Sequence, residues 1–466
     1  MRPPTVADVK RALPQASADL LDALLAAADA RRLSVYLVGG PVRDLLLERP
    51  VADLDLIVEA RGDEGAARLA RDAAPADASV TSHTRFGTVS VRAADCSVDL
   101  ANVRSETYAH DGALPAVAAG TLADDLRRRD FSVNALALPL SKQARAAHKS
   151  LVDLEEGLRD LRERRLRVLH ARSFHDDPTR ALRAARLAPR LGFALTRGSR
   201  AALRDALRDG AFGRVSGDRL RREIAKLFDD AAQRLDPSRA LGLLAEWHVL
   251  GALEPGLTLP PETAAPLRRV GRAVDSPPWR LTRWRPWVSG LAVWLAPLAP
   301  GLRRRSLRRF AVRGEAAQRI SGFPRARDGW LRSLSRARGR GAIDALLAEI
   351  DEEGLLALFA CAAPALRRRI VRYAAEDRMR RAPLRGDELV RIGLSGPAVG
   401  RALARVRAAY LDGAVRNPEE ALALARELAA RGGKGAARPR RKAKATGTRR
   451  TAAANSQPAR NPRTGK

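Results

Sequence analysis

SVYLVGGPVRDLLLERPVADLDLIVEA, residues 34–60, predicts a strand, a glycine turn, a short helix and a second strand. An apolar, β-prone run ends at Gly39-Gly40, and Pro41 suits the first turn of the helix that follows. Because glycines carry no side chain, their backbone N–H groups can approach an anion closely. A phosphate at the start of this helix would meet free N–H groups and the guanidinium of Arg43. The turn is therefore a candidate phosphate site.

The second strand of this stretch carries two acids, Asp53 and Asp55. Since side chains alternate between the faces of a strand, both carboxylates are expected on one face. Two neighbouring carboxylates repel unless a cation lies between them, and their hard oxygens suit Mg²⁺. For an Asp-x-Asp pair by itself, the alternative to a metal site is a pair of solvated acids on an edge strand. The glycine turn one helix upstream favours phosphoryl transfer, which needs phosphate and metal ligands side by side.

Composition narrows the class of protein. The chain has 466 residues, 45% of them hydrophobic, which is enough for two or three globular domains. Its net charge of +32 indicates a polyanionic partner such as nucleic acid. The two cysteines, Cys96 and Cys361, exclude a disulfide framework and a cysteine-based zinc site, and they fit a reducing cytoplasm. No run reaches ~18 uninterrupted apolar residues, so no membrane span is expected.

Several further segments of the first 140 residues have a predicted form. Residues 5–33 are expected to form one amphipathic helix, and residues 62–74 an alanine-rich helix on the sheet. TVSVR (88–92) and SVDLANV (97–103) alternate and predict a hairpin whose second strand carries Asp99. Asp99 is either a third acid within reach of the Asp53/Asp55 edge, if these strands are neighbours, or a carboxylate on the wet face of a strand. Residues 105–120 show no clear period and are expected to be a mobile loop over the site.

Two later segments combine charged and apolar residues. In DDLRRRDFSVNALALPL, residues 124–140, arginines could hold phosphates, and Asp130 or Asn134 could bond ribose hydroxyls; a capped helix with charged flanks is the alternative. In FHDDPTRALRAARLAPRLGF, residues 174–193, four charged residues recur every three positions along a helix that starts at Pro178. An N-cap with a solvated arginine face is one explanation. The other is that a carboxylate and a guanidinium match the Watson–Crick edge of a base.

Five motifs, in this order, resemble class II tRNA nucleotidyltransferases, the family of CCA-adding and A-adding enzymes and the related bacterial poly(A) polymerases. LVGGPVRDLLL with DLDLIV is similar to the head-domain signature, and VDLANVRSETY to the strand with a third carboxylate. RRDFSVNALAL resembles the ribose-selecting motif, usually written RRDFTxNAxA. DDPTRALRAARLAPRLGF resembles the base-recognition helix, and RVSGDRLRREI the neck motif after it. Together they cover about residues 34–230, and the DDPTR wording is closer to A-adding members.

The resemblance implies a role for each matching residue. The metal ligands and catalytic acids for two Mg²⁺ ions would be Asp53, Asp55 and Asp99. The glycine turn, Gly39 and Gly40, would hold the triphosphate together with Arg43. Arg129, Asp130 and Asn134 would bind the sugar and phosphate of the incoming nucleotide. Asp177 and Arg180 would read its base, with Arg183 and Arg186 in support. The sequence departs slightly from the family at Asn102 and Ser132, where threonine is usual, and at Asp176, where glutamate is commoner.

The expected fold is a polymerase-beta-like α/β head followed by an all-α neck, body and tail. The predicted divisions are a head at 1–140, a neck with the base-recognition helix at 141–235, a tRNA-binding body and tail at 236–432, and a disordered basic tail at 433–466. Residues 434–466 contain eleven Lys or Arg and no acid, so non-specific phosphate binding is expected there. Of the tryptophans, Trp284 and Trp287 are expected to be core residues rather than base-stacking platforms.

The predicted reaction is template-independent transfer of AMP from ATP, with CMP from CTP as a second candidate, to the 3′ end of tRNA. A poly(A) polymerase is the nearest alternative, with the same chemistry and another RNA acceptor. Metal-dependent glycosyltransferases also use Asp-x-Asp, but they leave Gly39-Gly40, Arg43 and RRDFSVNA unexplained. A non-catalytic RNA-binding protein would account for the charge without needing three aligned acids.

Overall fold

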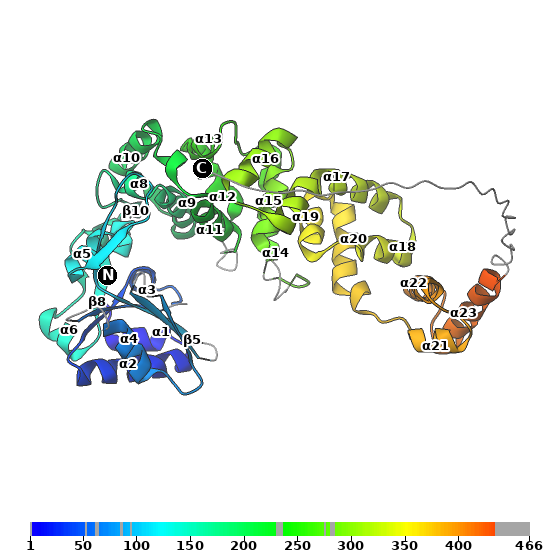
Figure 1. Ribbon diagram of the computed structural model, residues 1–466, viewed down its shortest axis with the longest axis horizontal. Helices are drawn as coiled ribbons and strands as arrows, with labels where there is room; N and C mark the ends of the chain where they lie inside the picture. Colours follow the sequence, from blue (N-terminus) through cyan, green and yellow to red (C-terminus); the bar gives the residue numbers. More distant parts are fainter. Residues whose placement is uncertain are drawn as a thin grey trace, which may run out of the picture. The chain divides into compact units, whose positions relative to one another are not determined.

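The computed structural model describes residues 2–51, 54–60, 65–83, 87–93, 96–229, 236–274, 276–279 and 285–433 (Figure 1). Three expectations lie outside the described residues: Asp53, Trp284 and the basic segment 434–466. The chain forms two compact units, one comprising residues up to 338 together with 342–380, the other 339–341 together with residues from 381 onwards. An α/β head followed by helices confirms the predicted fold class.

The head is built on one mixed sheet in the order β3-β4-β5-β2-β1-β8-β9. β2 and β5 are parallel, whereas the other neighbours in this sheet pair antiparallel. The strands are β1 Ser34–Val38, β2 Leu54–Glu59, β3 Ser79–His83, β4 Thr88–Ala93, β5 Cys96–Asn102, β8 Leu136–Pro139 and β9 Val152–Asp153. The predicted hairpin is confirmed as β4 and β5, and the apolar part of residues 124–140 becomes β8 beside β1.

Side-chain alternation gives the sheet two different faces. One face packs Val35, Leu37 and Leu56 against α1 Val6–Ala12, α2 Gln15–Ala30 and α4 Gly65–Ala73, and α2 and α4 are seen lying along it in Figure 1. The opposite face packs Tyr36 and Ile57 against α5 Leu122–Arg127 and α6 Lys142–Ala147. Asp55 has the same parity as Ile57, so its carboxylate leaves the second face.

Two predictions for the head were wrong in detail. The single helix expected over residues 5–33 is two helices, because Pro14 precedes α2 as its N-cap and cannot continue α1. The loop expected at 105–120 is shorter, because its two ends pair as a ribbon of β6 Arg104–Thr107 and β7 Ala116–Ala119 and leave 108–115 as the loop. The ribbon strands are short and β7 is mostly exposed, so no apolar alternation revealed them. A Cβ on Gly120 would lie 2.6 Å from the backbone nitrogen of Ser105, so the ribbon needs glycine there.

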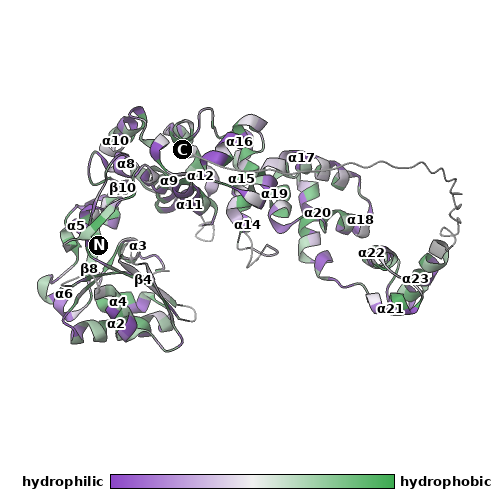
Figure 2. Ribbon diagram, viewed as in Figure 1, coloured by the Kyte–Doolittle hydropathy of each residue, from purple (hydrophilic) through white to green (hydrophobic). Residues whose placement is uncertain are grey.

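The rest of the larger unit is mainly helical. Hydrophobic and hydrophilic residues lie side by side along these helices, as the green and purple segments of Figure 2 show, and the apolar side chains join one continuous core. The segment 141–235, predicted as the neck and called so below, contains α7 Gly157–Arg162, β10 Arg165–Leu166, α8 Ser173–Asp176, α9 Thr179–Leu191, β11 Ala194–Leu195, α10 Arg197–Arg208 and α11 Gly217–Asp229. The helices that follow are α12 Pro237–Glu246, α13 Val249–Leu253, α14 Ala264–Ala273, α15 Pro286–Leu295, α16 Pro300–Arg309, α17 Gly314–Arg336, α18 Gly339–Leu347, α19 Glu352–Cys361 and α20 Pro364–Ala375.

The smaller unit has its own apolar core. It contains α21 Gly386–Arg391, α22 Pro397–Leu411 and α23 Pro418–Gly433, with Leu389, Val406 and Ala421 buried between them. Trp287, on α15 of the larger unit, packs against the main core, in agreement with its expected role. Across the described ranges, every helix is too short or too polar to cross a lipid bilayer.

One glycine lies where α15 packs closely against α11, and replacing it should destabilise the fold. A Cβ on Gly290 of α15 would lie 2.2 Å from the ring of Phe228, which is fully buried on α11. We expect Gly290→Ala to lower the free energy of unfolding by about 1–3 kcal/mol through overpacking. The matched control is Gly242→Ala on α12, where a Cβ meets nothing within 4 Å and about 0.5–1 kcal/mol should be gained. If the melting temperatures of both variants changed in the same direction relative to the wild type, this packing would be contradicted.

Candidate active site

The glycine turn and two acidic strands meet on the second face of the sheet. Gly39 has φ +74°, in the left-handed region that favours glycine, and it precedes α3 Gly40–Leu46. A Cβ on Gly39 would lie 3.7 Å from Asp55 Oδ2 and 3.1 Å from Arg129 Nη1. The turn is therefore held within reach of a carboxylate on one side and a guanidinium on the other.

Asp55 and Asp99 are direct partners across the parallel pair of β2 and β5. Neighbouring strands are about 4.8 Å apart, so the two carboxylates leave the same face side by side. Asp99 also accepts a hydrogen bond from the hydroxyl of Ser90 on β4. Within the described ranges, no cluster of three or more His, Cys, Asp or Glu could hold a metal; the third expected ligand, Asp53, lies outside those ranges.

A cavity of about 370 Å³ extends from the glycine turn to the neck helices. Its lining is strongly charged and comes from the head, the ribbon and the neck: Gly39, Gly40, Asp55, Arg104, Glu106, Tyr108, Pro115, Arg128, Arg129, Asp130, Asn134, Asp177, Arg180, Arg183 and Arg219. A second cavity of about 390 Å³ shares Asp55 with the first and contains Asp99 and Ser90. Asp55 thus lies where the two cavities meet, and Asp99 lies in the second of them.

The floor of the first cavity is a buried polar network centred on Asp130. Its Oδ1 accepts from Asn134 Nδ2 at 3.0 Å, and its Oδ2 accepts from Arg183 at 2.7–2.8 Å. Burial would raise the pKa of Asp130, but the charge of Arg183 and the hydrogen bond from Asn134 outweigh it, so the pKa lies below its usual range. Asn134 Oδ1 in turn accepts from Arg43 Nη1 at 2.7 Å. The network therefore fixes Asn134 from both sides.

Arg43 lies behind this network and does not line the cavity. It is buried, with its guanidinium bonded to Asp44 at 2.9 Å as well as to Asn134. Arg186 is also outside the lining and pairs with Glu223 of α11 at 3.3 Å. The other expected nucleotide-binding residues, Gly39, Gly40, Arg129, Asp130, Asn134, Asp177, Arg180 and Arg183, line one cavity.

Asp177 and Arg180 face this cavity from the start of α9. Asp177 Oδ1 accepts from the backbone N–H of Thr179 at 3.0 Å, so it caps the helix, and also from Arg219 Nη2 at 2.7 Å. Arg180 donates through Nη2 to the carbonyl of Arg128 at 2.8 Å, whereas its buried Nη1 has no hydrogen-bond partner among the described residues. A buried, unsatisfied donor in a cavity is typical of a site awaiting a ligand's acceptor.

Sequence reasoning missed three lining residues, Arg219, Glu106 and Tyr108, that hold the wall in place. Arg219, within the neck motif, links Asp177 to the carbonyl oxygens of Gly112 and Ala113 beyond β6. Glu106 accepts from Tyr108 at 3.0 Å and from Arg128 at 3.1 Å. Burial, reinforced by Glu106, raises the pKa of Tyr108. The only sequence signals were the motifs VDLANVRSETY and RVSGDRLRREI, in which these residues stand.

Two arginines in the RRRD segment are organised by a buried acid. Asp125 is fully buried and accepts from Arg128 and from Arg129, the latter at 2.7 Å. Burial would raise the pKa of Asp125, but Arg129 and Arg128 outweigh it and lower the pKa. The remaining edge of Arg129 lies beside Gly39, and its Nε has no partner among the described residues. The guanidinium is thus aimed at the glycine turn.

Known proteins resemble this chain in sequence and in fold. A family model for the poly A polymerase head domain matches residues 35–167. An A-adding tRNA nucleotidyltransferase of Halalkalibacterium halodurans is 30% identical over 85% of this chain and 89% of its own length. A CC-adding tRNA nucleotidyltransferase of Deinococcus radiodurans is 33% identical over 82% of this chain and 86% of its own length.

Another relative and a solved structure extend the likeness. The A-adding enzyme of Geobacter sulfurreducens is 35% identical over 57% of this chain, but the match spans only 29% of that longer protein. The structure of the Thermotoga maritima CCA-adding enzyme complexed with tRNA covers 92% of this chain and all of its own, with a TM-score of 0.65 and 26% identity. As its motifs predicted, the chain belongs to the family of tRNA nucleotidyltransferases and poly(A) polymerases.

Proposed function

We propose that this protein adds AMP, and also CMP when offered CTP, to the 3′ end of tRNA without a nucleic-acid template. The observation that carries the proposal is the single cavity in which the glycine turn and Asp55 face Asp177 and Arg180. Paired carboxylates suit nucleotidyl transfer, and a fixed acceptor–donor pair suits the reading of one base edge. The relatives are named for tRNA rather than for poly(A), which favours tRNA as the acceptor.

The acids fit divalent metal ions, which nucleotidyltransferases of this family generally use. Asp55 and Asp99 present hard carboxylate oxygens side by side, and two Mg²⁺ ions held by them and Asp53 would complete the site. When bound, such ions lower the pKa of the attacking 3′-hydroxyl and offset charge on the leaving pyrophosphate. The chain's own carboxylates set the place where that hydroxyl must approach the α-phosphate.

The nucleotide would lie along the cavity, with its triphosphate at the glycine turn and its base at the neck. Gly39, Gly40 and Arg129 supply backbone N–H groups and a guanidinium for the phosphates. Asn134 offers its remaining amide hydrogen to the sugar, because Asp130 already takes the other. Asp130 and Arg43 therefore act by holding Asn134, rather than through contact with the nucleotide. Arg183 holds Asp130, and Arg186 anchors α9 to Glu223.

Recognition of tRNA would fall to the helices after the head. The division into head (1–140), neck (141–235), body and tail (236–432) and basic end (433–466) assigns catalysis to the first two and RNA binding to the rest. Exposed arginines on α16, such as Arg304 and Arg308, could pair with the RNA backbone by charge. A cytoplasmic location, where tRNA is matured, completes the proposal.

The test offers purified protein two acceptors and four nucleotides. tRNA transcripts lacking one, two or three 3′ nucleotides are compared with an oligo(A) primer, each with ATP, CTP, GTP or UTP and Mg²⁺. The proposal expects extension of the tRNAs with ATP or CTP and little extension of the primer. Efficient growth of the primer with ATP, and none of the tRNAs, would assign the protein to poly(A) synthesis instead.

A further inference from the structure

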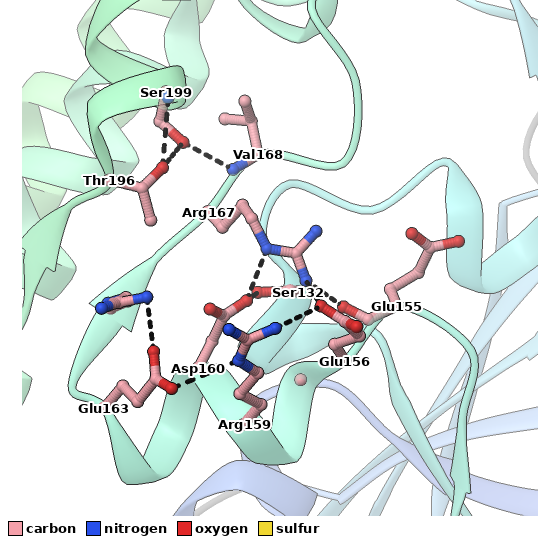
Figure 3. Close-up of polar contacts among 12 residues, drawn as sticks. Ser132, Glu155, Glu156, Arg159, Asp160, Glu163, Arg167, Val168, Thr196 and Ser199 are labelled. Atoms are coloured by element: carbon pink, nitrogen blue, oxygen red, sulfur yellow. Dashed lines mark hydrogen bonds and ion pairs between the residues drawn. The ribbon is translucent and has the colours of Figure 1, made fainter.

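A larger cavity lies on the neck, with none of the glycine-turn residues in its lining, and many of its charged groups form a network of ion pairs (Figure 3). Its volume is about 950 Å³, and five arginines and four acids line it. The charges are largely matched: Glu163 pairs with Arg159 and Arg165, and Asp160 pairs with Arg167. Matched charges do not favour the binding of an anion, so the network is better explained by a structural role, which is to hold neighbouring residues in place.

The deepest part of this network holds a residue of the predicted ribose motif. Ser132 is completely buried, and its hydroxyl donates to Asp160 Oδ2 at 2.5 Å. The same oxygen accepts from Arg167 Nε at 2.8 Å, and the backbone N–H of Ser132 donates to the carbonyl of Arg167 at 2.9 Å. Figure 3 shows Asp160 between Ser132 and Arg167. The carboxylate of Asp160 thus ties Ser132 to Arg167, the residue directly after β10.

Backbone packing confines the same turn from below. A Cβ on Gly157, at the start of α7, would lie 2.3 Å from the carbonyl oxygen of Ser132. Gly157 itself is fixed because its N–H donates to Asp153 Oδ1 at 2.7 Å. Phe131 forms an isolated bridge with Val168 on the other side of the turn. The turn therefore has little freedom to shift while these contacts persist.

The confined turn, Ser132–Asn134, is the one that presents Asn134 to the nucleotide cavity. We propose that Ser132 and Asp160 are positioning residues for Asn134 and so set the preference for a ribose over a deoxyribose in the incoming nucleotide. This inference rests on the proposed function, in which Asn134 contacts the sugar. A small displacement of a positioned group lowers transition-state binding without removing any contact to the ligand. Asp160 acts through the hydroxyl of Ser132 and touches no nucleotide atom.

The test is the ratio of kcat/KM for ATP to that for dATP, measured on tRNA lacking its last nucleotide. Ser132→Ala removes the hydroxyl and should lower this ratio about 5- to 10-fold, the effect of one lost hydrogen bond on a positioned group. Asp160→Asn should lower it similarly. Ser132→Thr keeps the hydroxyl and should restore the ratio. Glu163→Gln, an acid-to-amide change directly after the same helix at a residue whose ion pairs are to Arg159 and Arg165, should leave the ratio unchanged.

Two further measurements separate the possible failures. Melting temperatures identify variants that are merely unstable, and if Asp160→Asn does not fold, Ser132→Ala and Ser132→Thr decide the question. A folded Ser132→Ala with an unchanged ratio, beside an Asn134→Ala with a lowered one, would overturn the positioning role alone. If Asn134→Ala also leaves the ratio unchanged, the assignment of Asn134 to the sugar fails, and the positioning role fails with it.

Discussion

Replacing Asp55 by asparagine should reduce kcat for nucleotide addition by on the order of 10³-fold, with tRNA affinity unchanged. The side chain keeps its size, but it loses the charge that the acidic pair needs to bind a divalent cation. Asp55 lies opposite Asp99 and beside the Gly39 turn, so no other described carboxylate of the sheet can take its place. Single-turnover kinetics and filter binding of tRNA, both in Mg²⁺, measure the two effects.

The matched control for this variant is Asp72→Asn. Asp72 is a head-domain acid on α4 that pairs with Arg31, on the opposite side of the sheet from Asp55. The Asp72→Asn variant should retain full turnover. The Asp99→Asn variant should lose kcat to a similar extent as Asp55→Asn, because the two carboxylates share one site. Near-normal turnover of Asp55→Asn would refute the assignment of these acids.

Replacing Asp177 should relax the choice of base. ATP and CTP present an exocyclic amine next to a ring acceptor, whereas UTP and GTP do not in that arrangement. A carboxylate accepts from the amine, and Arg180, whose buried Nη1 lacks a partner among the described residues, donates to the acceptor. Asp177→Ala should therefore lose about 1–3 kcal/mol of transition-state binding for ATP and discriminate less against UTP and GTP.

Asparagine at this position separates base reading from helix capping. Asp177 Oδ1 caps α9 through Thr179, and Asn can keep that bond while replacing the second oxygen with a donor. Asp177→Asn should thus nearly retain the melting temperature yet shift selectivity toward UTP and GTP. Asp177→Ala should lose about 1 kcal/mol of stability as well. The relative kcat/KM values for the four nucleotides distinguish base reading from capping, with Asp176→Asn as the neighbouring control. Variants that are less stable but equally selective would show that Asp177 only caps the helix.

The parts of the site that follow from periodicity were predictable. Alternation in TVSVR and SVDLANV predicted a hairpin, and the same period of two placed Asp55 on a known face. The structure adds the register, which sets Asp55 directly opposite Asp99. Pro14 was a signal for the break between α1 and α2 that the prediction did not use, since proline lacks the backbone N–H that continues a helix.

The contacts between residues far apart in the chain could not be predicted from the sequence. Arg43 stands in a motif that suggests phosphate binding, but Asp44 and Asn134 take its donors inside the head. Arg219 is one of several arginines on α11, and only the fold brings it to Asp177 and the Gly112 carbonyl. Period and composition do not distinguish such a residue from its solvated neighbours on the same helix.

The most direct test of the central claim is the length of the product made from tRNA that lacks only its last nucleotide. With excess ATP and Mg²⁺, the wild-type protein should add a single AMP and release one pyrophosphate per tRNA, as sequencing of the 3′ ends and a pyrophosphate assay would record. No extension, or a long ladder of adenylates that grows equally well on an oligo(A) primer, would contradict a tRNA nucleotidyltransferase.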